Sequence, residues 1–454
     1  MIWGNCAILR INCIENIKTM YSIIKQQISV PRVMAYRHWM QPTLTLLKRR
    51  ITYKAVTENI TELEITPKIA IPARTQRDAR LLNVALGSRW ADSNKGEIDF
   101  SSCDYLAIGH DRAINEAHAK YIMSQISDGK AAWAKTGVWP RTRESPLFKF
   151  QEKAAEWLKA DAVVLTKSGM DANCSLMEIL LKYNDNIPVY LDFLVHATFR
   201  YGIKAMKGKM IVFKHNDLVD LEAKMTKRGP GFIIVDSIYS SIGTIAPLKG
   251  MCDLAEKYGS ALIVDESHAL GVHGHEGNGI VCQLGLEDRV HFRTSALTKG
   301  LACNGGIFTG RREFVGLFRG GTTKFAFSNA VEDHEAVRLI NALETVKQAN
   351  DKRKSLQIKF TYFKQELRNL GYMGYYLDPP TQLFGLVTGD YDNTVRFDRA
   401  LKAKGIYATT FVYPGAPRDR SLLRFNITDD LTKEQLDYTY SSTAIHRRWY
   451  SKAE

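Results

Sequence analysis

Short apolar runs recur through the middle of the chain, and each is separated from the next by a stretch with the spacing of an amphipathic helix. The expected strands cover residues 162–165, 189–191, 210–213, 232–235, 261–264, 290–292 and 307–309. Alternating strands and helices of this length are typical of a largely parallel sheet covered by helices on both faces. The pattern therefore predicts an α/β protein whose large domain is a doubly wound, mostly parallel sheet of these seven strands.

Further elements are expected on both sides of this sheet. Helices are predicted over 112–127 and from Ser145-Pro146 to Trp157, since proline is favoured at the first helical position. After the sheet, the pattern predicts a long polar helical region over 333–370, strands at 383–387, 408–412 and 422–427, and a helix from Thr432. This part of the chain therefore predicts a smaller C-terminal α+β domain. The expected divisions are a basic extension (1–60), an N-terminal arm (61–110), a large domain (111–325) and a small domain (326–454).

The net charge of +14 is unevenly distributed along the chain. Much of the excess precedes residue 56, where only Glu15 opposes Arg10, Lys18, Lys25, Arg32, Arg37, Lys48, Arg49, Arg50 and Lys54. This unevenness weakens a nucleic-acid-binding interpretation, and the mildly basic remainder suits an anionic substrate. The first 60 residues are an organellar transit segment, a basic surface arm or translated sequence upstream of a start near Met34 or Met40. We favour the last two, because the segment lacks the serine enrichment of transit peptides.

The seven cysteines are scattered and form no Cys-x-x-Cys pair, which argues against a zinc site or a disulfide framework. No run approaches the roughly 18 apolar residues that a membrane span needs. Both features fit a cytoplasmic protein without a membrane span.

Two strand ends carry the residue types of one particular chemistry. The run that ends at Val264 continues into Asp265-Glu266-Ser267-His268, and a later strand leads to Lys299, which small residues flank. Pyridoxal phosphate enzymes need a lysine that binds the cofactor covalently and a carboxylate that keeps the pyridine nitrogen protonated. Lys299 and Asp265 are our candidates. The structural alternative is that Asp265 caps a helix or pairs with a cation.

Other loops at the same predicted edge offer further contacts. Ser168, Gly169 and Met170 follow a strand and open a helix, so their backbone N–H groups are expected to form an anion site for a phosphate. His196 and Ser240 also follow strands, and an imidazole there can stack on a planar ring. The loop 129–144, which contains Trp133 and Trp139, can line a pocket, although a packed surface loop is the commoner explanation.

The order of these motifs resembles that of the α-oxoamine synthase family. The segments that carry the resemblance are Ser-Gly-x-x-Ala-Asn from 168, Asp-Ser-Ile-Tyr-Ser from 236, Asp-Glu-Ser-His from 265 and the lysine at 299. These are pyridoxal phosphate enzymes of fold type I that join an amino acid to an acyl-CoA. Within the family, the chain most resembles the α-hydroxyketone autoinducer synthases over roughly residues 97–440.

The resemblance implies a role for each motif residue. Lys299 holds the cofactor, Asp265 contacts its pyridine nitrogen, His268 its phenolic oxygen, and His196 stacks on its ring. The implied cofactor contacts are completed by Ser168, Gly169, Met170, Ser240, Thr298 and Ser328. Ser328 matches a segment that reaches the phosphate of the partner subunit, so a homodimer with shared active sites is implied. Arg424 matches the arginine that receives the amino-acid carboxylate, and Cys103 and Tyr105 fall in the substrate-binding segment.

Two positions depart from the family pattern. Ala296 stands where family members usually place Thr or Ser as a phosphate ligand, and Cys103 stands where they place Asn. Both changes can alter substrate choice without abolishing cofactor binding.

The activity implied by the resemblance is an acyl-CoA C-acyltransferase reaction. An amino-acid-type donor, 2-aminobutyrate or S-adenosylmethionine, loses its α-proton, attacks an acyl-CoA thioester and loses carbon dioxide to give an α-aminoketone, with Lys299 as the base, for quorum sensing. The alternative is a synthase of primary metabolism that makes 8-amino-7-oxononanoate, 2-amino-3-ketobutyrate or 5-aminolevulinate, or a serine palmitoyltransferase. A non-catalytic subunit or a basic nucleic-acid-binding protein remains a further alternative, although the first predicts loss of the lysine, which is present.

Overall fold

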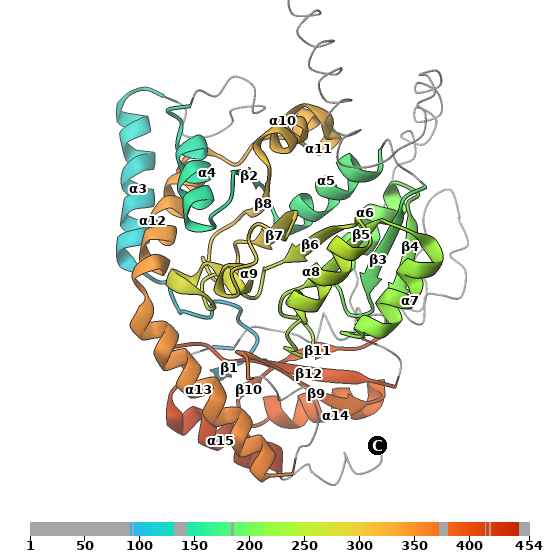
Figure 1. The fold of residues 1–454 in the computed structure, drawn as a ribbon. Helices are drawn as coiled ribbons and strands as arrows, with labels where there is room; N and C mark the ends of the chain where they lie inside the picture. Colours follow the sequence, from blue (N-terminus) through green and yellow to red (C-terminus); the bar gives the residue numbers. More distant parts are fainter. Residues whose placement is uncertain are drawn as a thin grey trace, which may run out of the picture. The chain divides into compact units, whose positions relative to one another are not determined.

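Seven strands, most of them buried, form one sheet (Figure 1), and short runs rich in β-branched and aromatic residues account for most of them. The computed structural model describes residues 91–92, 95–130, 143–182, 186–371, 380–413, 415–416 and 419–444. The strands are β2 (Ala162–Thr166), β3 (Pro188–Asp192), β4 (Lys209–Phe213), β5 (Phe232–Asp236), β6 (Ala261–Asp265), β7 (Phe292–Ala296) and β8 (Gly306–Gly310). Their order is β2-β8-β7-β6-β5-β3-β4, and only β8 runs against its neighbours. The predicted mostly parallel, seven-stranded sheet is confirmed.

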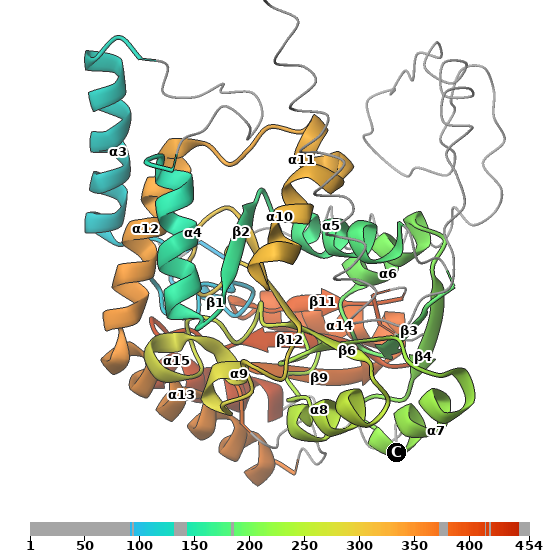
Figure 2. The same ribbon diagram turned by 45° about the horizontal axis from the view of Figure 1, so that its top comes forward.

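Both faces of this sheet are buried, as the alternation along β5 shows. Ile233 and Val235 belong to one apolar cluster, whereas Phe232 and Ile234 belong to another. Figure 2 shows α5 (Gly169–Leu181) and α6 (Ala197–Ala205) on one face and α8 (Leu248–Lys257) on the other. Burial of each such side chain contributes roughly 1.5–3 kcal/mol.

The helical region expected over 333–370 is two helices, α12 (Asp333–Gln348) and α13 (Asn350–Asn369). The helical conformation is interrupted at Ala349, whose ψ is 37°. The buried Arg353 donates to the carbonyls of Val346 and Lys347 in the last turn of α12, and the Val346 carbonyl also accepts the N–H of Ala349. An arginine bound to these carbonyls stabilises the break.

Other boundaries also differ from expectation. Strand β7 begins two residues later than its apolar run and continues to Ala296, because its later positions pair with β8. The strand expected at 408–412 is the shorter β11 (Thr409–Phe411), and a two-residue strand that was not predicted, β10 (Ile406–Tyr407), precedes it.

The C-terminal strands form a separate antiparallel sheet of order β11-β12-β9, with β9 at Leu383–Gly389 and β12 at Ser421–Asn426. A short parallel pair joins β1 (Ile98–Asp99) to β10. The other helices are α3 (Arg112–Ser127), α4 (Pro146–Trp157), α7 (Leu218–Arg228), α9 (Gly279–Gln283), α10 (Arg312–Gly321), α11 (Thr323–Phe327), α14 (Tyr391–Lys402) and α15 (Lys433–Ala444). The domain boundary at 325/326 stays a prediction.

Several expectations lie outside the described residues, namely those on the basic extension 1–60, on the arm up to residue 90 and on the loop residues 131–142. Within the described ranges, no helix has the length and hydropathy that crossing a membrane requires.

Candidate active site

The predicted site residues follow the C-terminal ends of β2, β3, β5, β6 and β7. Four of these strands pair in parallel, and their register places Asp236 beside Asp265 and Asp265 beside Thr294. Connections that leave the same edge of a parallel sheet converge, which is where such sheets bind ligands. The loops that carry Ser168, His196, Ser240, His268 and Lys299 therefore share one edge.

Asp265 ends β6 and is 5% exposed. Its carboxylate accepts a hydrogen bond of 2.9 Å from the Asn173 amide and another of 2.9 Å from the N–H of Ser267. Asn173 also donates to Thr198 Oγ1, which bonds to His196 Nδ1. One chain of polar contacts thus ties the end of β6 to α5 and to the start of α6. Sequence reasoning missed the role of Asn173, although it lies in the motif that begins at Ser168.

Lys299 lies in a turn directly after β7, partly buried. Burial lowers the pKa of its amine, and the nearby Asp265 carboxylate opposes that shift. Cys103 and Asp236 also raise the Lys299 pKa, whereas Arg424 lowers it. A lysine with a lowered pKa has more of the neutral form that can attack a carbonyl.

Close backbone contacts hold the Lys299 turn against the loop after β6. A Cβ on Gly300 would lie 2.0 Å from the Leu270 carbonyl oxygen and 3.1 Å from Gly271 Cα. Only a glycine at position 300 allows the two backbone segments to come this close, so the position of Lys299 depends on Gly300.

We expect Gly300→Ala to destabilise the protein by about 1–3 kcal/mol, since backbone atoms must shift to admit the methyl group. Thermal unfolding and the cofactor absorbance of the purified protein measure both effects. Gly316→Ala is the control, because a Cβ there meets nothing within 4 Å. Equal stability of the two variants would contradict the role of this contact.

His268 and Tyr105 form a buried pair. The Tyr105 hydroxyl lies 2.6 Å from His268 Nδ1, and both side chains are almost fully buried. Burial lowers the pKa of His268 well below its usual value and raises that of Tyr105 well above. Both groups are therefore neutral at pH 7, and we assign the hydroxyl as donor to Nδ1, which leaves Nε2–H to donate elsewhere. Gln382, which sequence reasoning also missed, donates to the His268 carbonyl at 2.6 Å.

His196 caps the start of α6 and reaches solvent. The loops around its ring lower the His196 pKa through desolvation, while Asp265 raises it and Lys299 and Arg424 lower it further. The charges of Asp265, Lys299 and Arg424 thus all act on the His196 ring.

The start of α5 offers the expected anion site. Ser168 caps the helix by accepting from the N–H of Asp171 at 3.1 Å. As first residues of the helix, Gly169 and Met170 have no intrahelical acceptor for their N–H groups. Gly169 packs on Ala296 so closely that an added Cβ would lie 2.7 Å from the alanine methyl. A hydroxyl at position 296 is absent, but Ser267 Oγ lies 2.7 Å from the Ala296 nitrogen.

Arg424 in β12 joins the C-terminal sheet to these loops. It donates to the Ser240 carbonyl at 3.0 Å and contacts the Cys103 sulfur at 3.7 Å. Its guanidinium lies 5.0 Å from the centre of the Phe411 ring, and its Nε is buried without a hydrogen-bond partner in the described structure. An arginine whose buried N–H group has no partner can donate a hydrogen bond to a bound oxyanion.

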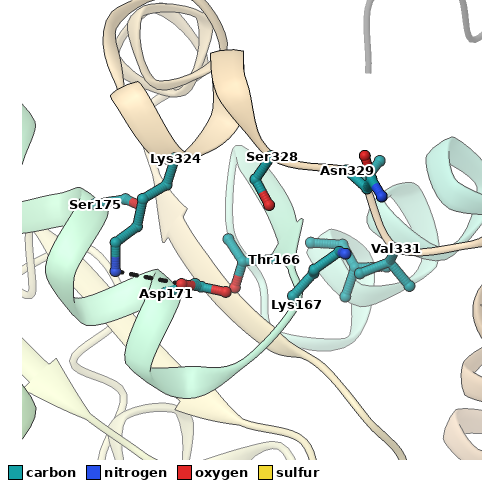
Figure 3. Close-up of a pocket in the computed structure, with 10 residues that line it drawn as sticks. Thr166, Lys167, Asp171, Ser175, Lys324, Ser328, Asn329 and Val331 are labelled. Atoms are coloured by element: carbon teal, nitrogen blue, oxygen red, sulfur yellow. Dashed lines mark hydrogen bonds and ion pairs between the residues drawn. The ribbon is translucent and has the colours of Figure 1, made fainter. Parts of the chain in front are cut away.

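Ser328 lies at a separate pocket beside the connection between β2 and α5 (Figure 3). Thr166, Lys167, Asp171 and Lys324 also line this pocket, and Lys324 pairs with Asp171 at 3.3 Å. Ser328 and Thr298 are exposed, so their predicted phosphate contacts stay predictions.

These residues fit pyridoxal phosphate. Asp265 is a buried carboxylate held by two donors, Lys299 has a lowered pKa, and the start of α5 offers free N–H groups beside a glycine cradle. The unpartnered Nε of Arg424 and Oδ1 of Asn173 are buried polar atoms that a bound polar ligand can satisfy.

The sheet order and the residues at its edge define an α/β transferase of fold type I. The model of the family described as aminotransferase class I and II matches residues 131–442. The CAI-1 autoinducer synthase of Vibrio campbellii is 31% identical over 361 residues, covering 79% of this chain and 88% of that protein. The chain belongs to the aminotransferase class I and II family and, within it, to the α-oxoamine synthases.

Other relatives support the same family. The 8-amino-7-oxononanoate synthase of Fervidobacterium nodosum is 29% identical over 368 residues, covering 79% of this chain and 90% of that protein. A serine palmitoyltransferase from S. paucimobilis with bound PLP has the same fold, with a TM-score of 0.72 at 19% identity, covering 78% of this chain and 87% of that one. The predicted family, fold class and pyridoxal phosphate cofactor are confirmed.

Proposed function

We propose that this α-oxoamine synthase joins an acyl-CoA to an amino-acid-type donor and releases carbon dioxide to give an α-aminoketone. The observation that carries the proposal is that Asp265 and Lys299 follow adjacent parallel strands at one edge of the sheet, where Arg424 also bonds to the Ser240 carbonyl at 3.0 Å. A lysine that binds the cofactor is found in enzymes of many reactions. The arginine at the same site, whose Nε–H is buried without a hydrogen-bond partner in the described structure, favours a substrate with a carboxylate.

Pyridoxal phosphate, when bound, supplies an electron sink for the carbanion that forms at the donor's α-carbon. Asp265, whose carboxylate is fixed by Asn173 and Ser267, would hold a proton on the pyridine nitrogen through its negative charge. His268 would donate from Nε2 to the phenolic oxygen, and His196 would cover the ring. The start of α5, with Ser240, would bind the phosphate.

Lys299 is the proposed base that takes the donor's α-proton. Burial lowers its pKa, so more of the amine is in the neutral form that can accept a proton once it is free. Arg424 orients the donor carboxylate, and the buried Tyr105 holds His268 in position. Fixing both substrates in one site supplies the orientation that a bimolecular condensation lacks in water.

We expect Arg424→Lys to raise the KM for the amino donor about tenfold or more, because an ammonium group lacks the bidentate geometry of guanidinium. Steady-state kinetics with each substrate varied in turn measure the effect. Arg399→Lys on the exposed side of α14 is the control. A rise confined to the KM for acyl-CoA would contradict the assignment.

The proposed donor is 2-aminobutyrate or S-adenosylmethionine, for synthesis of a quorum-sensing autoinducer. The relative that supports this choice is the CAI-1 autoinducer synthase at 31% identity. The second candidate is a synthase of primary metabolism, favoured by relatives such as the 8-amino-7-oxononanoate synthase at 29% identity.

A mass spectrum of the products separates the two candidates. The purified protein is offered a panel of acyl-CoAs of different lengths with 2-aminobutyrate, S-adenosylmethionine, glycine, alanine and serine in separate reactions. An aminoketone formed only with the first two donors supports the autoinducer synthase. Products only from glycine, alanine or serine support primary metabolism, and no product from any pair contradicts the acyltransferase proposal.

We further propose a cytoplasmic homodimer in which Ser328 reaches the partner's cofactor. Analytical ultracentrifugation measures the mass of the assembly and so tests for the dimer.

The nucleic-acid-binding alternative has its own test. A nucleic-acid-binding protein would show salt-sensitive binding that survives removal of the first 55 residues.

A further inference from the structure

Two histidines and a glutamate meet where α3 packs against α12. His118 lies in the middle of α3, and His334 and Glu335 lie in the first turn of α12. The two helices run side by side in Figures 1 and 2 and make extensive contact. None of these three residues takes part in the cofactor site described above.

The donor atoms of this His118-His334-Glu335 cluster all lie within 4.8 Å of one another. His118 Nε2 is 2.9 Å from His334 Nδ1, and Glu335 Oε1 is 3.9 Å from the same His334 nitrogen. A tetrahedral ion bound at about 2.0–2.1 Å needs its nitrogen ligands about 3.3 Å apart, so small side-chain shifts are sufficient.

A second observation points to a ligand in the cluster. Glu335 Oε2 is a buried oxygen without a hydrogen-bond partner in the described structure. Leaving a carboxylate oxygen unsatisfied is costly, and a metal ion would satisfy it. The side chains of His334 and Glu335 are 16% and 22% exposed, so an ion has access from solvent.

We propose that His118, His334 and Glu335 bind a divalent transition-metal ion of the zinc type, which ties α3 to α12. Two imidazoles and a carboxylate are a ligand set that zinc accepts, with water in the fourth position. The alternative is that the two histidines form only a hydrogen bond between the helices, in which case no ion is needed.

The test uses the untagged full-length holoenzyme after treatment with a chelator. Calorimetric titration with Zn²⁺ should show one equivalent per chain with a dissociation constant on the order of micromolar, weaker than four-ligand structural sites. Co²⁺ in its place should give the visible absorption bands of a tetrahedral site. Thermal unfolding should shift upward with Zn²⁺, by mass action on the folded state.

Three variants identify the ligands. His118→Gln, His334→Gln and Glu335→Gln should each weaken Zn²⁺ binding at least about tenfold, as loss of one of three ligands requires. His275→Gln is the matched control, because that side chain is 87% exposed and outside the cluster. Glu335→Gln is nearly isosteric, so it keeps the test valid if a histidine variant fails to fold. Absence of Zn²⁺ uptake, or uptake that Glu335→Gln leaves unchanged, would overturn the proposal.

Discussion

Lys299→Met should remove covalent cofactor binding and lower turnover at least about a thousandfold, because the variant lacks the only group we assign as both anchor and base. Methionine has nearly the volume of lysine, so packing in the turn after β7 is kept. Borohydride reduction followed by mass spectrometry detects cofactor fixed to the protein, and product formation measures turnover. Lys249→Met, at an exposed position of α8, is the control and should keep both properties. Cofactor fixed to the Lys299 variant would show that another lysine is the anchor.

The same substitution should stabilise the protein in its cofactor-free form. Burial lowers the pKa of Lys299 in the folded state, whereas in the unfolded chain it is about 10.4. At a pH between these two pKa values, Lys299 binds more protons in the unfolded chain than in the folded protein, so its contribution to the free energy of unfolding rises with pH. Below the folded-state pKa, the full cost of burying the charged amine is present. Methionine removes that cost. At pH 7, a lower unfolding temperature for the cofactor-free variant than for the cofactor-free wild type would contradict this account.

The strands of the large sheet could be predicted because each is short, apolar and bounded by polar turns. Lys299, Asp265 and His268 could be predicted for a related reason, since reactive residues that directly follow buried strands must lie at one edge of a parallel sheet. The antiparallel direction of β8 was not specified in advance, because an apolar run does not show which way it pairs.

Contacts between distant segments could not be predicted from local patterns. Arg424 and Cys103 are 321 residues apart in the chain. They meet because the C-terminal sheet contacts the loop after β5, where Arg424 donates to the Ser240 carbonyl. The break at Ala349 is accompanied by a contact with the side chain of Arg353, four residues further along, which donates to the Val346 carbonyl. Asn173 was visible within a motif, but its bond to Asp265 follows from the packing of α5 on the sheet.

Asp265 and Asp236 offer a matched comparison of two buried carboxylates. They end adjacent strands, are paired in register and are 5% and 3% exposed. Burial, followed by the charge of Asp265, raises the pKa of Asp236 well above its usual value. This shift makes Asp236 easier to protonate than an ordinary carboxyl group, and asparagine imitates the protonated form in shape and charge.

Asp265→Asn should lower kcat about a hundredfold or more, because a neutral amide cannot hold a proton on the pyridine nitrogen through charge. Asp236→Asn should retain kcat within a few-fold, since asparagine keeps an oxygen that can accept the His196 N–H, 3.4 Å from Asp236 Oδ1. Steady-state kinetics on both variants, with circular dichroism to verify folding, make the comparison. If the two substitutions lowered kcat equally, catalysis would require the negative charge of both carboxylates. Assigning the pyridine contact to Asp265 alone would then be wrong.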